Sequence, residues 1–157
     1  MTEVNGLRLA YRGLIAGLAG GYVWIAIAML LSAVVDGDPL LPLRPVALAL
    51  SPLAGSPELA FVLGLGAVQA GGALIGIIFA YFFARFFTVR ATLALAAPAI
   101  ALLAWGLVGT VVARDTGILA FATHPIPVIA SLGYGLLLGA AVPVRGEVTR
   151  YAGSPST

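Results

Sequence analysis

Long apolar stretches, separated by short polar or proline-containing segments, organise the whole chain. Four of them approach or exceed the length of about 20 apolar residues that a helix needs to cross the hydrocarbon core of a bilayer. They are residues 13–35, 59–84, 91–113 and 125–144. The pattern predicts an all-α protein, a bundle of four transmembrane helices that forms one integral membrane domain over residues 1–157.

The connections between these stretches are unequal. Residues 36–58 hold half of the chain's 10 prolines but stay apolar between them. Proline breaks a continuous helix, and unpaired backbone is not tolerated in lipid. This segment is therefore predicted to lie at the outer interface, with a short helix near residues 46–50. The connection at residues 88–90 is tight, which predicts that the second and third helices are antiparallel neighbours.

Composition supports the membrane assignment. Only 9% of the residues are charged and 61% are hydrophobic, with a mean hydropathy of +1.10, whereas soluble domains carry about 25% charged residues. The net charge of +2 comes from dispersed arginines without a basic cluster, which argues against nucleic acid as a partner. Cysteine is absent, which excludes thiolate catalysis, cysteine-ligated iron–sulfur clusters and covalently attached haem.

The arginines predict the orientation. Six of them would fall on one side of the membrane: Arg8, Arg12, Arg85, Arg90, Arg145 and Arg150. The opposite side would hold two arginines against four acidic residues, so the positive-inside rule places both termini in the cytoplasm. All basic residues are arginine and the chain is rich in Ala and Gly, which is typical of a GC-rich genome. A multi-pass protein of a prokaryotic cytoplasmic (inner) membrane is therefore expected.

Small residues recur every four positions in three of the four stretches. Because such rows let two helix backbones approach closely in lipid, they are predicted to be helix-packing positions: Gly13, Gly17 and Gly21; Gly72, Gly76 and Ala80; Ser131, Gly135 and Gly139. Aligning Gly72 with Gly135, and Trp24 with Trp105, also permits a parallel two-plus-two repeat of helix pairs.

Gln69 and Tyr134 are the candidates for a polar contact within the membrane. Gln69 precedes Gly72 by three residues and therefore shares its helix face. An interhelical hydrogen bond, worth roughly 1 kcal/mol, is favoured over a ligand or ion contact because no second strongly polar side chain at similar depth completes a site.

Chemistry-bearing groups are scarce. No predicted span holds an ionisable residue away from its ends, where transporters and proton relays keep them. Arg85 lies in the sequence FFARFF at the cytoplasmic end of the second span, where it could anchor a lipid head group. His124 is the only histidine, and one histidine does not build a metal or haem site. No catalytic residue, metal or cofactor is expected, and the chain is not predicted to be an enzyme.

Three segments carry a resemblance: GLIAGLAGGYVWIAIAMLL before the proline-rich loop, GAVQAGGALIGIIFAYFF, and SLGYGLLLGA near the end. Together they resemble a group of small four-helix membrane proteins of bacteria and archaea of unknown function. The resemblance covers most of the chain and implies a fold without an activity.

The leading functional hypothesis is a non-catalytic accessory or structural subunit that packs in a larger membrane complex, such as a respiratory or other energy-transducing complex. It rests on the small-residue rows, the lack of internal chemistry and outer aromatic faces formed by Phe79, Phe82, Phe83, Phe86 and Phe87. One alternative is a small homo-oligomeric channel or transporter lined by Gln69, Ser131 and Tyr134. Another is a lipid- or quinone-binding module that uses the phenylalanines and Arg85. The expected partners are the bilayer and other membrane subunits, with a homo-oligomer left open.

Overall fold

The structure, a computed structural model, describes residues 3–83, 86–107 and 124–143. The described residues form five α-helices and one π-helical turn, so the all-α prediction is confirmed for this part of the chain. The elements are α1 (Glu3–Val35), α2 (Arg44–Leu50), α3 (Pro57–Ile78), the π-helical turn η1 (Phe79–Phe83), α4 (Arg90–Leu107) and α6 (Pro125–Ala141).

Three helical stretches of the described chain are long and apolar enough to cross a membrane: Gly6–Val35, Pro57–Phe83 and Arg90–Leu107. α6 is apolar as well but has 17 residues. These stretches indicate a membrane protein. α2 forms where the short helix near residues 46–50 was predicted, whereas residues 84, 108–113 and 144 of the predicted spans lie outside the described residues.

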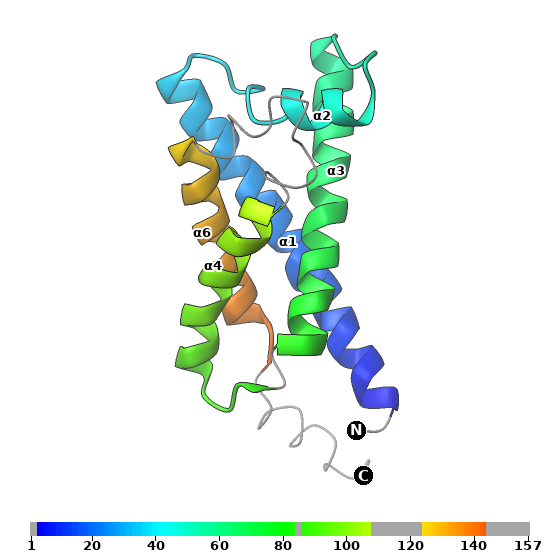
Figure 1. The fold of residues 1–157 in the computed structure, drawn as a ribbon, viewed down its shortest axis with the longest axis vertical. Helices are drawn as coiled ribbons and strands as arrows, with labels where there is room; N and C mark the ends of the chain where they lie inside the picture. Colours follow the sequence, from blue (N-terminus) through cyan, green and yellow to red (C-terminus); the bar gives the residue numbers. More distant parts are fainter. Residues whose placement is uncertain (1–2, 84–85, 108–123, 144–157) are drawn as a thin grey trace, which may run out of the picture.

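The helices pack in the spatial order α3, α1, α6, α4. α1 lies against α3 on one side and α6 on the other, and α4 packs against α6 (Figure 1). α3 and α4 hardly touch, so the prediction that the second and third helices are neighbours was wrong. The small residues explain the difference, because Gly and Ala rows close the α1–α3 and α4–α6 contacts. The residues between α3 and α4, such as Gly71 and Ala101, are too small to bridge the gap.

Arginines gather at one end of the described structure. α1 begins, α4 begins and α6 ends at the same end (Figure 1), which brings Arg8 and Arg12 of α1 to the end that holds Arg90. There Arg90 Nη1 donates a hydrogen bond to the carbonyl oxygen of Ala140, at 2.7 Å. A cation at this position complements the negative end of the α6 dipole.

The opposite end is built around a turn that follows α1. Gly37 has a φ of 71°, a conformation that favours glycine. Asp38 Oδ1 accepts a hydrogen bond from the backbone nitrogen of Leu40 at 3.0 Å, and Asp38 Oδ2 lies 2.6 Å from Arg44 Nη1. The turn and the ion pair together hold the chain between α1 and α2.

Phe79 lies in the core and is fully buried, so its assignment to an outer face was wrong. It follows Gly72 by seven residues and therefore sits on the helix side that faces α1. Phe82, Phe83 and Phe86 are exposed, as predicted, and Phe87 is half-buried.

Candidate functional site

The α1–α3 crossing is a contact between backbones. A Cβ atom added to Gly76 would collide with the carbonyl oxygen of Gly13 and lie 2.7 Å from Gly17 Cα. A Cβ atom on Gly17 would collide with the carbonyl oxygen of Gly72, and one on Gly13 would lie 2.7 Å from Ala80 Cβ. Real Cβ atoms essentially never come within 3.0 Å of another residue, so these positions have room for hydrogen only.

The α4–α6 crossing is built in the same way. A Cβ atom on Gly135 would lie 2.7 Å from the backbone nitrogen of Pro98, and one on Gly139 would lie 2.8 Å from Ala94 Cα. The predicted small-residue positions of α3 and α6 thus lie at contacts within the chain. Gly21 differs, because its neighbour is the Gln69 side chain, with Oε1 at 2.8 Å from an added Cβ.

Gln69 bridges α3 to α1. In the amide orientation that satisfies both of its polar atoms, the nitrogen donates to the carbonyl oxygen of Leu18 at 3.0 Å. The oxygen accepts from the backbone nitrogen of Tyr22 at 3.2 Å. This geometry agrees with an interhelical hydrogen bond and leaves the amide engaged within the bundle.

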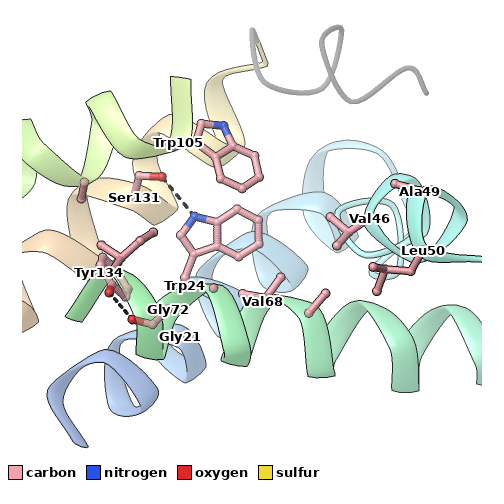
Figure 2. Close-up of a pocket in the computed structure, with 14 residues that line it drawn as sticks. Gly21, Trp24, Val46, Ala49, Leu50, Val68, Gly72, Trp105, Ser131 and Tyr134 are labelled. Atoms are coloured by element: carbon pink, nitrogen blue, oxygen red, sulfur yellow. Dashed lines mark hydrogen bonds between the residues drawn. The ribbon is translucent and has the colours of Figure 1, made fainter. Parts of the chain in front are cut away.

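Three further polar side chains meet where α1, α3 and α6 converge (Figure 2). Trp24 Nε1 donates to Ser131 Oγ at 3.1 Å, and the Tyr134 hydroxyl donates to the carbonyl oxygen of Gly72 at 2.7 Å. The Tyr134 ring lies directly over Gly20, where an added Cβ would be 2.7 Å from Cδ2. Ser131 therefore acts as a hydrogen-bond acceptor rather than only as a small packing residue.

The two tryptophans of the chain meet in the same region. The ring centroids of Trp24 and Trp105 are 4.9 Å apart, with an interplanar angle of 39°. This contact between α1 and α4 was missed by sequence reasoning. The sequence held one indication of it, because Trp24 and Trp105 occupy equivalent positions when the first and third predicted spans are aligned.

An apolar pocket of about 250 Å³ opens between α3 and α4 (Figure 2). Its floor contains buried Trp24, Ala101 and Tyr134, and its α3 wall contains Val68 and Gly71. Three residues of α2 line it as well: Val46, Ala49 and Leu50. Sequence reasoning missed this pocket because no polar motif marks it. One residue could have indicated an open space: Gly71 lies outside the packing row, and in the structure no atom lies within 4 Å of a Cβ added to it.

The remaining predicted residues contribute little to this site. Arg85 lies outside the described residues. His124 caps α6, and its Nδ1 accepts weakly from the backbone nitrogen of Ile126 at 3.5 Å. Ser32 is fully buried, and within the described part of the chain its hydroxyl has no hydrogen-bond partner. No group of three metal-ligating side chains occurs among the described residues.

No protein family, curated relative or solved structure matches the chain. The resemblance to small four-helix membrane proteins therefore stays a prediction, and function has to be inferred from the residues themselves.

Proposed function

We propose that the chain is a non-catalytic, four-span integral membrane subunit that packs in a larger complex of a prokaryotic inner membrane. α1, α3, α4 and α6 are the spans, with both termini in the cytoplasm. At about 1.5 Å per residue, the 17 residues of α6 reach roughly 25 Å, at the short end of what a span requires.

The observation that carries this proposal is that three polar side chains of the bundle, Gln69, Tyr134 and Ser131, are hydrogen-bonded within it. The Gln69 amide is bonded to the α1 backbone, the Tyr134 hydroxyl to Gly72, and the Ser131 hydroxyl to Trp24. These are the three residues that a channel would use to line its path. Engaged in this way, they favour a packing role and weaken the channel alternative.

Contact with other subunits is supported by the large apolar surface that the chain leaves uncovered. Only 22% of the best apolar window in Pro57–Phe83, and 17% of that in Arg90–Leu107, is buried within the protein. The glycine rows do not contribute to such contacts because they are used within the bundle. Partner helices would instead meet the exposed aliphatic and aromatic faces, including Leu103 and Phe82.

A helix-pair repeat also forms part of the proposal. An offset of 81 positions relates residues of α1 to their structural counterparts in α4: Gly17 to Pro98, Gly13 to Ala94, and Trp24 to Trp105. Gly72 and Gly76 precede Gly135 and Gly139 by the same 63 positions. The two helix pairs thus use equivalent residues for equivalent contacts, as expected for two copies related by an axis along the membrane normal. The contact between the equivalent residues Trp24 and Trp105 would lie on that axis.

Topology can be tested because the chain has no cysteine. Leu53 and Thr88 are exposed at opposite ends of the bundle, so each can carry a single reporter, Leu53→Cys or Thr88→Cys. A membrane-impermeant maleimide should label Leu53→Cys in intact cells and Thr88→Cys only after permeabilisation. Labelling of both from outside would refute the four-span arrangement, and the reversed pattern would refute the orientation.

The subunit role requires a separate experiment. Extraction in mild detergent at native expression should yield other membrane proteins in fixed stoichiometry with the chain. Recovery of a lone symmetric oligomer would contradict the proposal. A solute flux in liposomes that is abolished in Gln69→Leu, but kept in the lipid-facing control Leu74→Ala, would favour the channel alternative instead.

A further inference from the structure

The pocket between α3 and α4 occupies the place where the proposed repeat is broken. With the offset of 63 positions, Tyr134 of α6 corresponds to Gly71 of α3, and with the offset of 81, Gly20 of α1 corresponds to Ala101 of α4. In one half of the molecule the Tyr134 ring fills the space against Gly20. In the other half Gly71 and Ala101 face the same cavity, and nothing from the described chain fills it.

The lining is suited to hydrocarbon. The polar atoms Trp24 Nε1, Ser131 Oγ and Tyr134 OH are bonded within the protein, and the Trp105 indole nitrogen is buried. No charged residue is among the described residues that line the pocket. The lining offers a polar head group or ring little beyond the Ser131 and Tyr134 hydroxyls, which are already bonded within the protein, whereas aliphatic groups would contact the indole faces and the Val68 side chain.

The shape of the site favours a slender occupant over a protein helix. α2 contributes Val46, Ala49 and Leu50 to the lining and covers the outer end of the gap (Figure 1). A transmembrane helix from another subunit could not follow the gap past α2, but a flexible chain can enter from the side, between α3 and α4. An engineered apolar cavity of about 150 Å³ already binds benzene, so about 250 Å³ accommodates a chain segment of several methylene groups.

We propose that the pocket between α3 and α4 binds an acyl chain of a membrane phospholipid. The acyl chain fills the space between α3 and α4, as the Tyr134 ring fills the equivalent space between α6 and α1. This inference is independent of any partner subunit, so it can be tested on the purified protein alone.

The two tryptophans provide the measurement, since they are the only ones in the chain and both line the pocket. The full chain is reconstituted into phosphatidylcholine vesicles in which a rising fraction of the lipid carries brominated acyl chains, and tryptophan quenching is recorded. The Trp105→Phe variant leaves Trp24 as sole reporter. Because Trp24 is only 4% exposed and lines the pocket, a bromine atom comes close to its ring by entering the pocket.

The decisive variant is Gly71→Tyr, which introduces in α3 the side chain that fills the equivalent space in α6. The matched control is Gly66→Tyr on the same helix, an exposed position with no atom within 4 Å of an added Cβ and outside the pocket. In the Trp105→Phe background, quenching should be strong in the Gly66→Tyr protein and fall at least twofold in the Gly71→Tyr protein. Gly71→Leu provides the same test with a smaller group if the tyrosine variant does not fold.

Equal quenching in the Gly66 and Gly71 variants would mean that bromine acts from the surrounding bilayer, and would overturn the proposal. Absence of quenching in the parent would also overturn it. A change in oligomeric state on Gly71→Tyr, measured by cross-linking and not accompanied by a change in quenching, would assign the gap to a second copy of the chain. Relief of quenching by a small amount of added long-chain isoprenoid alcohol would assign it to an isoprenoid tail rather than to phospholipid.

Discussion

Substitution of Gly76 by alanine tests the close approach of α1 and α3 most directly. The added methyl group would lie 2.7 Å from Gly17 Cα and 2.9 Å from Gly17 N, and would also meet the carbonyl oxygen of Gly13. All three neighbours are backbone atoms, so no side-chain rotation relieves the overlap. Gly17 Cα has to move by about 0.7 Å to reach ordinary contact at 3.4 Å, and the two helices must separate.

The magnitude follows from that separation. A radial gap of about 0.5–1 Å loses a quarter to a half of the dispersion energy of each atom pair along the crossing. Overpacking of this kind costs about 1–3 kcal/mol in protein interiors. The higher helix propensity of alanine offsets little of this cost, because the helices of a membrane protein stay formed in its unfolded state in the membrane or detergent. We therefore expect Gly76→Ala to lower the free energy of unfolding by about 1–3 kcal/mol.

Gly66→Ala is the matched control. It makes the same chemical change on the same helix, ten residues away, at an exposed position outside the pocket, and its Cβ has no atom within 4 Å. Unfolding in mixed micelles with rising sodium dodecyl sulfate, followed by tryptophan fluorescence, should give a lower midpoint for Gly76→Ala than for Gly66→Ala. Equal midpoints would show that α1 and α3 do not meet through their glycines.

The remaining predictions use the same unfolding assay. Tyr134→Phe keeps the ring but removes the hydrogen bond to Gly72, so it should lower stability by about 1 kcal/mol, and the exposed Tyr22→Phe should not; no difference between them would contradict the bond. Gln69→Leu removes two bonds to the α1 backbone and should cost roughly 1 kcal/mol or less; an increase in stability would show that the amide is poorly satisfied. Arg90→Gln removes the cation at the end of α6 and should destabilise at low salt more than at high salt; a salt-independent loss would mean that the charge is not responsible.

Sequence reasoning could predict the helices because apolar length and proline placement are local properties of the chain. The start of α6 at Pro125 and the short helix α2 follow from such signals. The small-residue rows marked positions of close contact, but they could not say which helix would be the partner. A row of glycines presents a smooth surface that fits several neighbours, and the partner depends on the register of all the helices together.

The pocket could not be predicted from the sequence for a related reason. A cavity is defined by side chains that are missing, and Gly71 is one of many glycines in the chain. Only the structure separates Gly72, which lies in a crossing, from Gly71, which faces open space. Gly71 stands out only when it is compared with its counterpart Tyr134, whose ring fills the equivalent space. That comparison requires the structural equivalence of two contacts, Gly17 with Gly72 and Pro98 with Gly135.

The energy of an empty cavity explains why the gap needs an occupant. Cavities left in protein cores cost about 24 cal/mol per Å³, so about 250 Å³ would cost up to roughly 6 kcal/mol if it were closed and empty. That is comparable to the whole stability of many domains. Collapse of α4 onto α3 would remove this cost, but the tilted ring contact between Trp24 and Trp105 and the backbone contact of Pro98 with Gly135 hold α4 against the rest of the bundle. In a bilayer the surrounding solvent is itself hydrocarbon, so an acyl chain fills the space without giving up hydration, and the bundle keeps a gap that water would force it to close.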